Sequence, residues 1–252
     1  MDETMRLVLL LVLSFGSGVI DLCLGMGFGF TITPLMLMLG YTPSVAVPAV
    51  LFSSFIGGVF SSIFNHRIHN VDFSRDSRAT RVALFTAAMG VIGSIAGVTI
   101  SFNLPQRTIG LYIGFLVIAS GALVIYSKGL VSGFSWTKMS IISLIGSLNK
   151  GLTGSGFGPV ITTGAMLSGI DEKSSVSIQS LSESAVSIVG FLTYLVLRKP
   201  ISYAPLIVMS VAVIAASPVA AKIMHRLNGD RMRKMVGVLA LIIGSFTLLK
   251  YW

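Results

Sequence analysis

The sequence is poor in charge, in acidic residues and in cysteine. Only 11% of its 252 residues are charged, with 9 acidic against 18 basic side chains, whereas soluble domains carry about 25% charged residues. The single cysteine, Cys23, lies in an apolar run and excludes an intrachain disulfide. No Ser/His/Asp or Cys/His combination occurs within the apolar runs, which argues against an enzyme. The histidines of "HRIH", His66 and His69, lie in a charged loop without cysteine or acidic partners, so we expect no metal and no cofactor.

Apolar sequence is what the chain has in excess, at 54% hydrophobic residues. The apolar runs recur along the whole length, which predicts an all-α, polytopic membrane protein. The first run continues without a small-residue cleavage site, so we interpret it as a membrane segment and not as a signal peptide. Six runs approach the ~20 residues that a bilayer-spanning helix requires: 44–64, 82–101, 108–126, 175–197, 203–221 and 235–251.

Two further apolar regions, 5–39 and 137–168, are each interrupted by a cluster of glycines. We expect each region to form a broken pair of helices, the second only about a dozen residues long: Phe28–Leu39 and Phe157–Ser168. Such a segment is too short to cross ~30 Å of hydrocarbon. Broken helices are tolerated at membrane depth only where protein buries them or a watery cavity adjoins them.

The two interruptions are copies of one pattern. "DLCLGMGFGF" (21–30) and "NKGLTGSGFGPV" (149–160) superimpose at a constant separation of 129 residues, as from Gly25 to Gly154, and this places Asp21 on Lys150. We therefore expect an internal duplication with halves 1–127 and 128–252, each containing a broken pair followed by three full spans.

Loop charge predicts how the halves are oriented. The net charge of +9 resides in short connections, which favours the positive-inside bias over a nucleic-acid surface. The most basic connections, 65–81 and 222–234, follow different spans of their halves, so both face the cytoplasm only if the repeats are inverted. This arrangement places twelve Lys/Arg inside and five outside, among them Arg107, Arg198 and Lys199, with Lys150 at membrane depth. Both termini would then face outward in the plasma membrane.

The paired breaks predict an anion site. A helix that begins at mid-membrane presents unsatisfied N–H groups and the positive end of its dipole. In an inverted repeat, two such N-termini converge from opposite sides, and glycine lets the backbone approach a ligand closely. We expect the anion between Gly25–Phe28 and Gly154–Phe157. The expected contacts are Gly25, Gly27, Phe28, Ser53, Asn149, Lys150, Gly154, Ser155, Gly156, Phe157 and Gln179.

Three charged residues of the apolar segments invite two interpretations. An intramembrane lysine is costly and usually functional, so Lys150 either contacts the substrate or forms a structural pair with Asp21 or Glu183. Glu183 lies four residues after Gln179 on one helix face. It is either a proton or counter-charge site together with Asp21, or a glutamate near a helix end that reaches water. The small polar residues around the second break, Asn149 and Ser155 among them, suit substrate contact and helix packing alike.

The motifs also resemble a known family. "GMGFGFTITPLM" (25–36) is similar to the glycine-rich signature of TauE/SafE sulfite exporters, the TSUP or DUF81 family. "FSSFIGGVFSSIFNHRIHNVDF" (52–73) resembles that family's second segment, with Phe73 where the family has Trp, and "GSGFGPVITT" (154–163) repeats the first motif weakly. The resemblance implies a bacterial or archaeal-type carrier for small anions such as sulfite, sulfonates or thiosulfate. Lys150 matches no family motif.

Together these features predict a secondary transporter for a small sulfur-containing anion that works by alternating access, with proton coupling as an option. An uptake permease or anion channel of the same fold is the alternative within transport. A membrane assembly factor for a respiratory complex is the alternative outside it. The expected partners are the anionic substrate, the bilayer and, as one option, a second copy of the chain, but no nucleic acid.

Overall fold

The computed structural model of the chain describes residues 2–101, 104–126, 133–197 and 201–251, and every regular element in them is a helix. The helices are α1 (Glu3–Leu24), α2 (Phe28–Met38), α3 (Pro43–Arg67), α4 (Arg78–Ser101), α5 (Gln106–Tyr126), α6 (Trp136–Thr153), α7 (Phe157–Leu167), α8 (Glu172–Val196), α9 (Tyr203–Arg226) and α10 (Gly229–Tyr251). Within the described residues, five helices (α1, α3, α4, α8 and α9) are long and apolar enough to cross a membrane. The predicted all-α, polytopic class is confirmed.

The two expected breaks are present, and each has the same backbone conformation. Gly25 ends α1 with φ 70° and Gly154 ends α6 with φ 69°. Gly27 and Gly156, which precede the short helices, have φ 87° and 80°. Because L side chains rarely adopt positive φ, glycine is needed at these turns. The short helices α2 and α7 begin at Phe28 and Phe157 as expected, and each has 11 residues.

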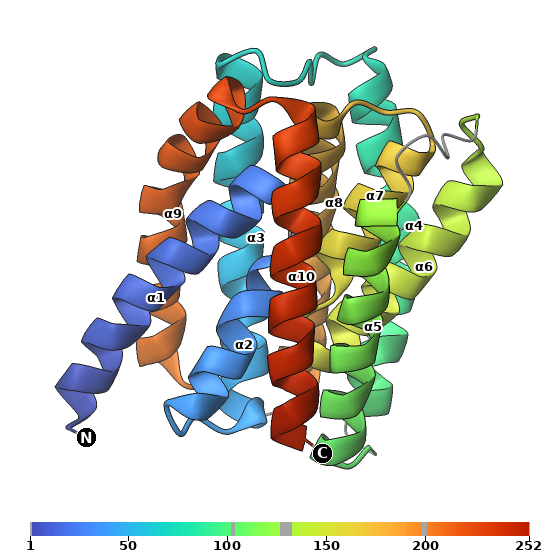
Figure 1. Ribbon diagram of the computed structural model, residues 1–252. Helices are drawn as coiled ribbons and strands as arrows, with labels where there is room; N and C mark the ends of the chain where they lie inside the picture. The colour runs from blue at the N-terminus through green and yellow to red at the C-terminus, as the bar shows by residue number, and fades with distance from the viewer. Residues whose placement is uncertain (1, 102–103, 127–132, 198–200, 252) are drawn as a thin grey trace.

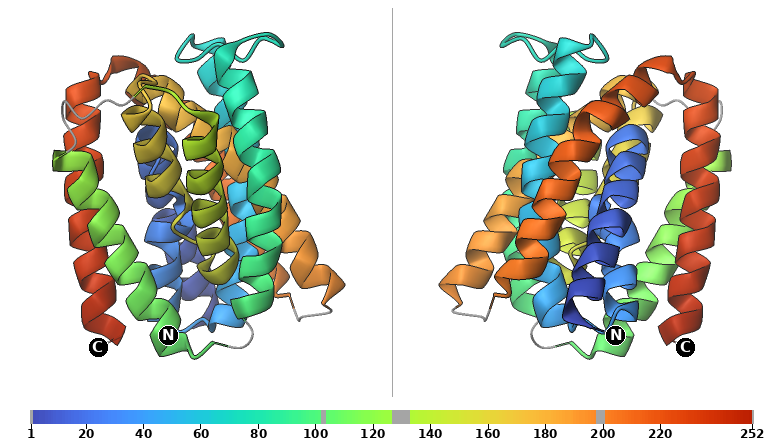
Figure 2. Two further views of the ribbon diagram at one scale, coloured as in Figure 1. Left: turned by 90° about the vertical axis from the view of Figure 1, so that its right-hand side faces the viewer. Right: turned by 90° about the vertical axis from the view of Figure 1, so that its left-hand side faces the viewer.

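The helices alternate in direction, and the second five run opposite to the first five (Figure 1). In the first half, α1, α3 and α5 run away from the end where both termini lie, and α2 and α4 run back toward it. In the second half, α7 and α9 run away from that end, and α6, α8 and α10 run back toward it. The α3–α4 and α9–α10 connections therefore lie at the same end, opposite the termini (Figure 2). Arg198 and Lys199, which the charge argument assigns to the other end, lie outside the described residues.

Helix contacts follow a matching scheme in the two halves. Helix α1 packs on α9, and α6, the first helix of the second half, packs on α4. Helix α3 packs on α9 just as α8 packs on α4, while α3 contacts α8 and α5 contacts α10. The α5–α10 pair lies along one side of the bundle (Figure 2).

Glycines allow α4 and α6 to cross closely. A Cβ added at Gly97 would lie 2.2 Å from the Leu148 carbonyl oxygen, and one at Gly151 would lie 2.3 Å from that of Ser94. Gly93 and Gly97 have the GxxxG spacing that lets membrane helices approach through their backbones. This crossing holds α6, and hence the second break, against the bundle.

Candidate functional site

A buried ion pair lies at the centre of the helices. The Lys150 ammonium, in the last turn of α6, donates to Glu183 Oε1 at 2.5 Å and to the Ser54 hydroxyl at 2.9 Å. The exposed fractions of Lys150 and Glu183 are 0% and 3%. Gln179, one turn earlier on α8, donates its amide to the other carboxylate oxygen of Glu183. Glu183 lies in the middle of α8 and not near a helix end, and Lys150 connects α6 to both α3 and α8.

Asp21, the residue of the first half that aligns with Lys150, has a different partner. Its side-chain oxygen accepts the Gly27 N–H at 2.5 Å. Gly27 directly precedes α2, so the side chain near the end of α1 caps the short helix that follows the break. Asp21 is 2% exposed and lies in the electrostatic field of both Lys150 and Glu183. One half-helix N-terminus is thus already occupied by a carboxylate of the chain.

The two breaks contact each other through their backbones. A Cβ on Gly29 would lie 1.7 Å from the Gly154 carbonyl oxygen, and one on Gly158 would lie 2.2 Å from the Gly27 nitrogen. The Thr162 hydroxyl donates to the Gly25 carbonyl at 2.9 Å and joins α7 to the first break. The structure therefore leaves no room between the breaks themselves, where we expected the anion to lie. The glycines at positions 29 and 158 serve close backbone contact instead.

At the start of α7 the polar groups are neutral. Asn149 Oδ1 accepts the Tyr112 hydroxyl at 2.5 Å, while the Asn149 amide nitrogen and the Ser155 hydroxyl are buried without a hydrogen-bond partner among the described residues. The Thr153 hydroxyl accepts the Ser155 N–H at 3.0 Å and donates to the Asn149 carbonyl at 2.7 Å.

The polar residues around the breaks and their neighbours thus separate into two adjacent groups. The first, which we call the charged centre, contains Asp21, Ser53, Ser54, Lys150, Gln179 and Glu183. Asp21, Phe28, Ser53, Ser54 and Glu183 line one internal space, and it is too narrow to hold a water molecule. The second group, at the α7 N-terminus, contains Asn149, Ser155, Gly156 and Phe157.

Two participating residues were absent from the predicted site. Ser54 aligns with Glu183 at the separation of 129 residues, so the duplication itself was the signal that could have found it. Tyr112 lies on α5, outside both repeated motifs, and no sequence signal connects it with Asn149.

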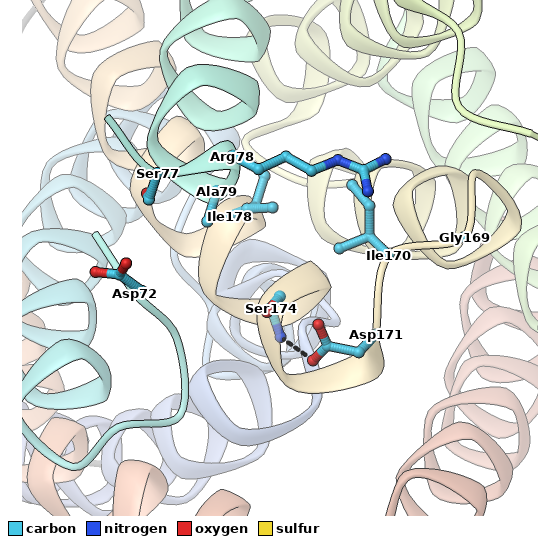
Figure 3. A pocket seen from close by; sticks show the side chains of 9 residues that line it. All are labelled: Asp72, Ser77, Arg78, Ala79, Gly169, Ile170, Asp171, Ser174 and Ile178. Atoms are coloured by element: carbon cyan, nitrogen blue, oxygen red, sulfur yellow. Dashed lines mark hydrogen bonds between the residues drawn. The ribbon is translucent and has the colours of Figure 1, made fainter. Parts of the chain in front are cut away.

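Polar cavities open at the two ends of the bundle. One, of about 320 Å³, lies at the end with the basic connections and is lined by Asp72, Ser77, Arg78, Ala79, Gly169, Ile170, Asp171, Ser174 and Ile178 (Figure 3). The other, of about 270 Å³, lies at the end with the termini and is lined by Glu3, Arg6, Leu7, Tyr41, Ser202, Ala204 and Pro205. Neither cavity includes a residue of the charged centre.

The charged centre is closed to solvent, since Asp21, Lys150 and Glu183 are at most 3% exposed, and apolar clusters adjoin both cavities. Ile178, at the first cavity, packs in a cluster with Val82 and Met139. Tyr41, at the second, packs against a cluster that includes Leu10 and Met209. The charged centre is therefore closed from both ends in this conformation.

Broken helices around a buried charged centre in a polytopic bundle are the architecture of membrane transporters. A family model for the sulfite exporter TauE/SafE matches residues 10–247, and the chain belongs to this family. It is also similar to the "Probable membrane transporter protein YtnM" of Bacillus subtilis (strain 168), at 26% identity over 260 residues that cover 98% of this chain and 84% of the relative. The chain is therefore a multi-pass membrane protein of a transporter family, which is not a class of enzymes.

Proposed function

We propose that the protein is a secondary transporter for a small sulfur-containing oxyanion or sulfonate, built from two inverted repeats that alternate in access. The observation that carries this proposal is the fully buried Lys150–Glu183 pair beside a half-helix N-terminus. A buried charge pair is costly to desolvate and contributes little net stability. Its presence at membrane depth is more readily explained by transport than by folding.

The charged centre provides a route for anion entry. Asp21 holds the α2 N-terminus in the way that a substrate carboxylate or sulfonate would, because backbone N–H groups and the helix dipole favour any anion there. An arriving anion displaces Asp21 from the Gly27 N–H and draws the Lys150 ammonium away from Glu183. In the conformation described, Lys150 forms the structural pair; in the substrate-bound one, it contacts the anion.

The charges of the centre favour proton coupling. One cation and two carboxyl groups lie together there, so an added anion leaves negative charge uncompensated in a low-dielectric site. Uptake of a proton by Asp21 or Glu183 as the anion enters removes part of this imbalance. We therefore propose that anion and proton move together.

The matching helix contacts and the two end cavities support alternating access. Rocking of one repeat against the other would open one apolar layer while the other stays closed. The basic connections 65–81 and 222–234 would face the cytoplasm, with both termini outside. An uptake permease or channel of the same fold is the second candidate within transport.

Reconstitution in liposomes tests the proposal. We expect wild-type protein to move sulfite, thiosulfate or methanesulfonate, and an inward proton gradient to accelerate the flux. The double variant Lys150→Met with Glu183→Gln removes both charges of the pair and should abolish flux. Lys138→Met, at the exposed start of the same helix, is the matched control and should transport normally. Full flux in the double variant would exclude Lys150 and Glu183 from the mechanism. A wild-type flux that does not change with the proton gradient would favour a channel.

A further inference from the structure

The hydrogen bond from Tyr112 occupies the amide oxygen of Asn149 and leaves its amide nitrogen for another partner. Tyr112, on α5, donates its hydroxyl to Asn149 Oδ1 at 2.5 Å. The amide nitrogen of Asn149 is then the group left to face another partner, and it has none among the described residues although Asn149 is only 1% exposed. A buried donor without an acceptor costs free energy. Its presence points to a ligand that supplies the acceptor.

A second unpartnered donor lies beside the first. The hydroxyl of Ser155 has no partner among the described residues, and Ser155 is 2% exposed. The next residue, Gly156, is the N-cap of α7, and a Cβ placed on it would lie 3.1 Å from the Asn149 Cβ. Both donors therefore adjoin the N-terminus of the 11-residue helix α7, where the dipole also favours negative charge.

The corresponding N-terminus in the first half shows what such a position accepts. There the Asp21 carboxylate accepts the Gly27 N–H, but the second half has Lys150 in the aligned place, and its ammonium contacts Glu183 instead. The α7 N-terminus is therefore without the carboxylate that α2 has. It carries neutral donors in its place.

We propose that Asn149 and Ser155, with the α7 N-terminus, form a second anion subsite that accepts one oxygen of a small oxyanion, and that Tyr112 is the positioning residue that aims the Asn149 amide into it. The subsite rests on the proposed transport function and assigns to the substrate a second set of contacts, separate from Lys150. Helix α5 contacts α7 directly and pairs with α10 at the side of the bundle (Figure 1).

Two variants of the full chain in detergent test the subsite by thermal unfolding. Asn149→Asp removes the amide donor and places a carboxylate beside the α7 N-terminus, as Asp21 lies at that of α2. We expect its melting temperature to rise without ligand and its response to sulfite to vanish. If Asn149 serves packing alone, a new buried charge lowers the melting temperature; that result would overturn the proposal.

Tyr112→Phe leaves the amide free to rotate. Since Tyr112 is partly exposed, we expect the fold to persist. The KM for sulfite uptake should rise about five- to tenfold, as for loss of one hydrogen bond, with kcat little changed. Tyr203→Phe, an exposed tyrosine at the start of α9, is the matched control. An unchanged KM in Tyr112→Phe would overturn the positioning role.

The two proposals fail separately. If wild-type protein binds sulfite but does not move it, the transport function fails, and the loss or persistence of the sulfite response in Asn149→Asp still decides the subsite. If wild-type protein transports sulfite and both variants match it, the subsite is wrong while the charged centre stands.

Discussion

A single unpaired charge is costly to bury in a membrane interior, and Lys150 and Glu183 reduce this cost by pairing with each other. The ammonium has two partners from two helices, and the carboxylate has an additional donor in Gln179. The sequence identified these residues as intramembrane charges but left the partner of Lys150 open. Asp21 and Glu183 were both candidate partners in the sequence, and it is the contact of α6 with α8 in the fold that brings Lys150 to Glu183.

Breaking the pair from one side should destabilise the protein more than removing it whole. Lys150→Ala leaves a buried carboxylate without its cation, which costs about 3–5 kcal/mol. We expect a large fall in melting temperature for Lys150→Ala and a smaller one for Lys150→Met combined with Glu183→Gln. Unfolding of detergent-solubilised variants measures both. Equal losses would show that the pair does not act as a unit.

A substitution at Asp21 can remove the negative charge of the side chain while keeping its hydrogen bond from the Gly27 N–H. In Asp21→Asn the side-chain oxygen still accepts the Gly27 N–H, and asparagine is a good N-cap, so we expect a near-normal melting temperature. The negative charge is lost, so the pH dependence of sulfite uptake should flatten if Asp21 carries the coupled proton. An unaltered pH profile would transfer that role to Glu183.

Asp72 is the matched control for this experiment. It is exposed, and the backbone N–H and then the hydroxyl of Ser74 lower the pKa of its carboxyl. A lowered pKa means that its stabilising contact is present above the ordinary aspartate range and is lost only as the pH falls through the lowered value. Between about pH 5 and 8 the charge of Asp72 is constant, so Asp72→Asn should leave the pH profile of uptake unchanged.

At the scale of the helix, the glycine clusters have more than one role. The positive φ angles at Gly25, Gly27, Gly154 and Gly156 follow from the turns, and the start of each short helix was predictable from the pattern. The direct contact between the breaks was not predictable. Glycine permits close approach of either a ligand or another backbone, and the sequence does not distinguish the two.

Alanine substitutions should therefore lower the melting temperature at the close-packed glycines and not at an exposed one. Gly29→Ala and Gly158→Ala place a methyl group 1.7 Å and 2.2 Å from backbone atoms of the other break. Overpacking of this kind costs about 1–3 kcal/mol or more, so both variants should melt earlier and lose transport. Gly16→Ala, on the exposed face of α1 with nothing within 4 Å of the added methyl, should melt at the same or a higher temperature. A neutral effect of Gly158→Ala would contradict the close packing of the breaks.

At the scale of the molecule, the helices match the expected segments closely, because the apolar runs are long and the loops between them are charged. The alternation of directions places both basic connections at one end of the bundle, which is the arrangement that the positive-inside bias requires of inverted halves. Loop charge does not encode the mutual packing of the halves or the lateral position of α5 and α10. Consequently the contact of Tyr112 with Asn149 could not be anticipated.

The orientation in the membrane can be tested because the chain has one cysteine. Cys23 is buried, and Cys23→Ser provides a background without reactive thiols. Single cysteines then replace exposed residues at both ends of the bundle, chosen so that no basic charge is removed: Asp76 and Asn228 at one end, Thr42 and Thr108 at the other. We expect a membrane-impermeant maleimide added to intact cells to label Thr42→Cys and Thr108→Cys.

Asp76→Cys and Asn228→Cys should react only after the cells are permeabilised. This pair decides between the two arrangements of the halves, since Asp76 follows α3 in the first half and Asn228 follows α9 in the second. In an inverted repeat both positions are cytoplasmic; in a parallel repeat one of them must face outside. Labelling of both in intact cells would reverse the predicted orientation but leave the repeats inverted. Labelling of only one of them would refute the inverted topology. It would also remove the basis for alternating access between two equivalent conformations.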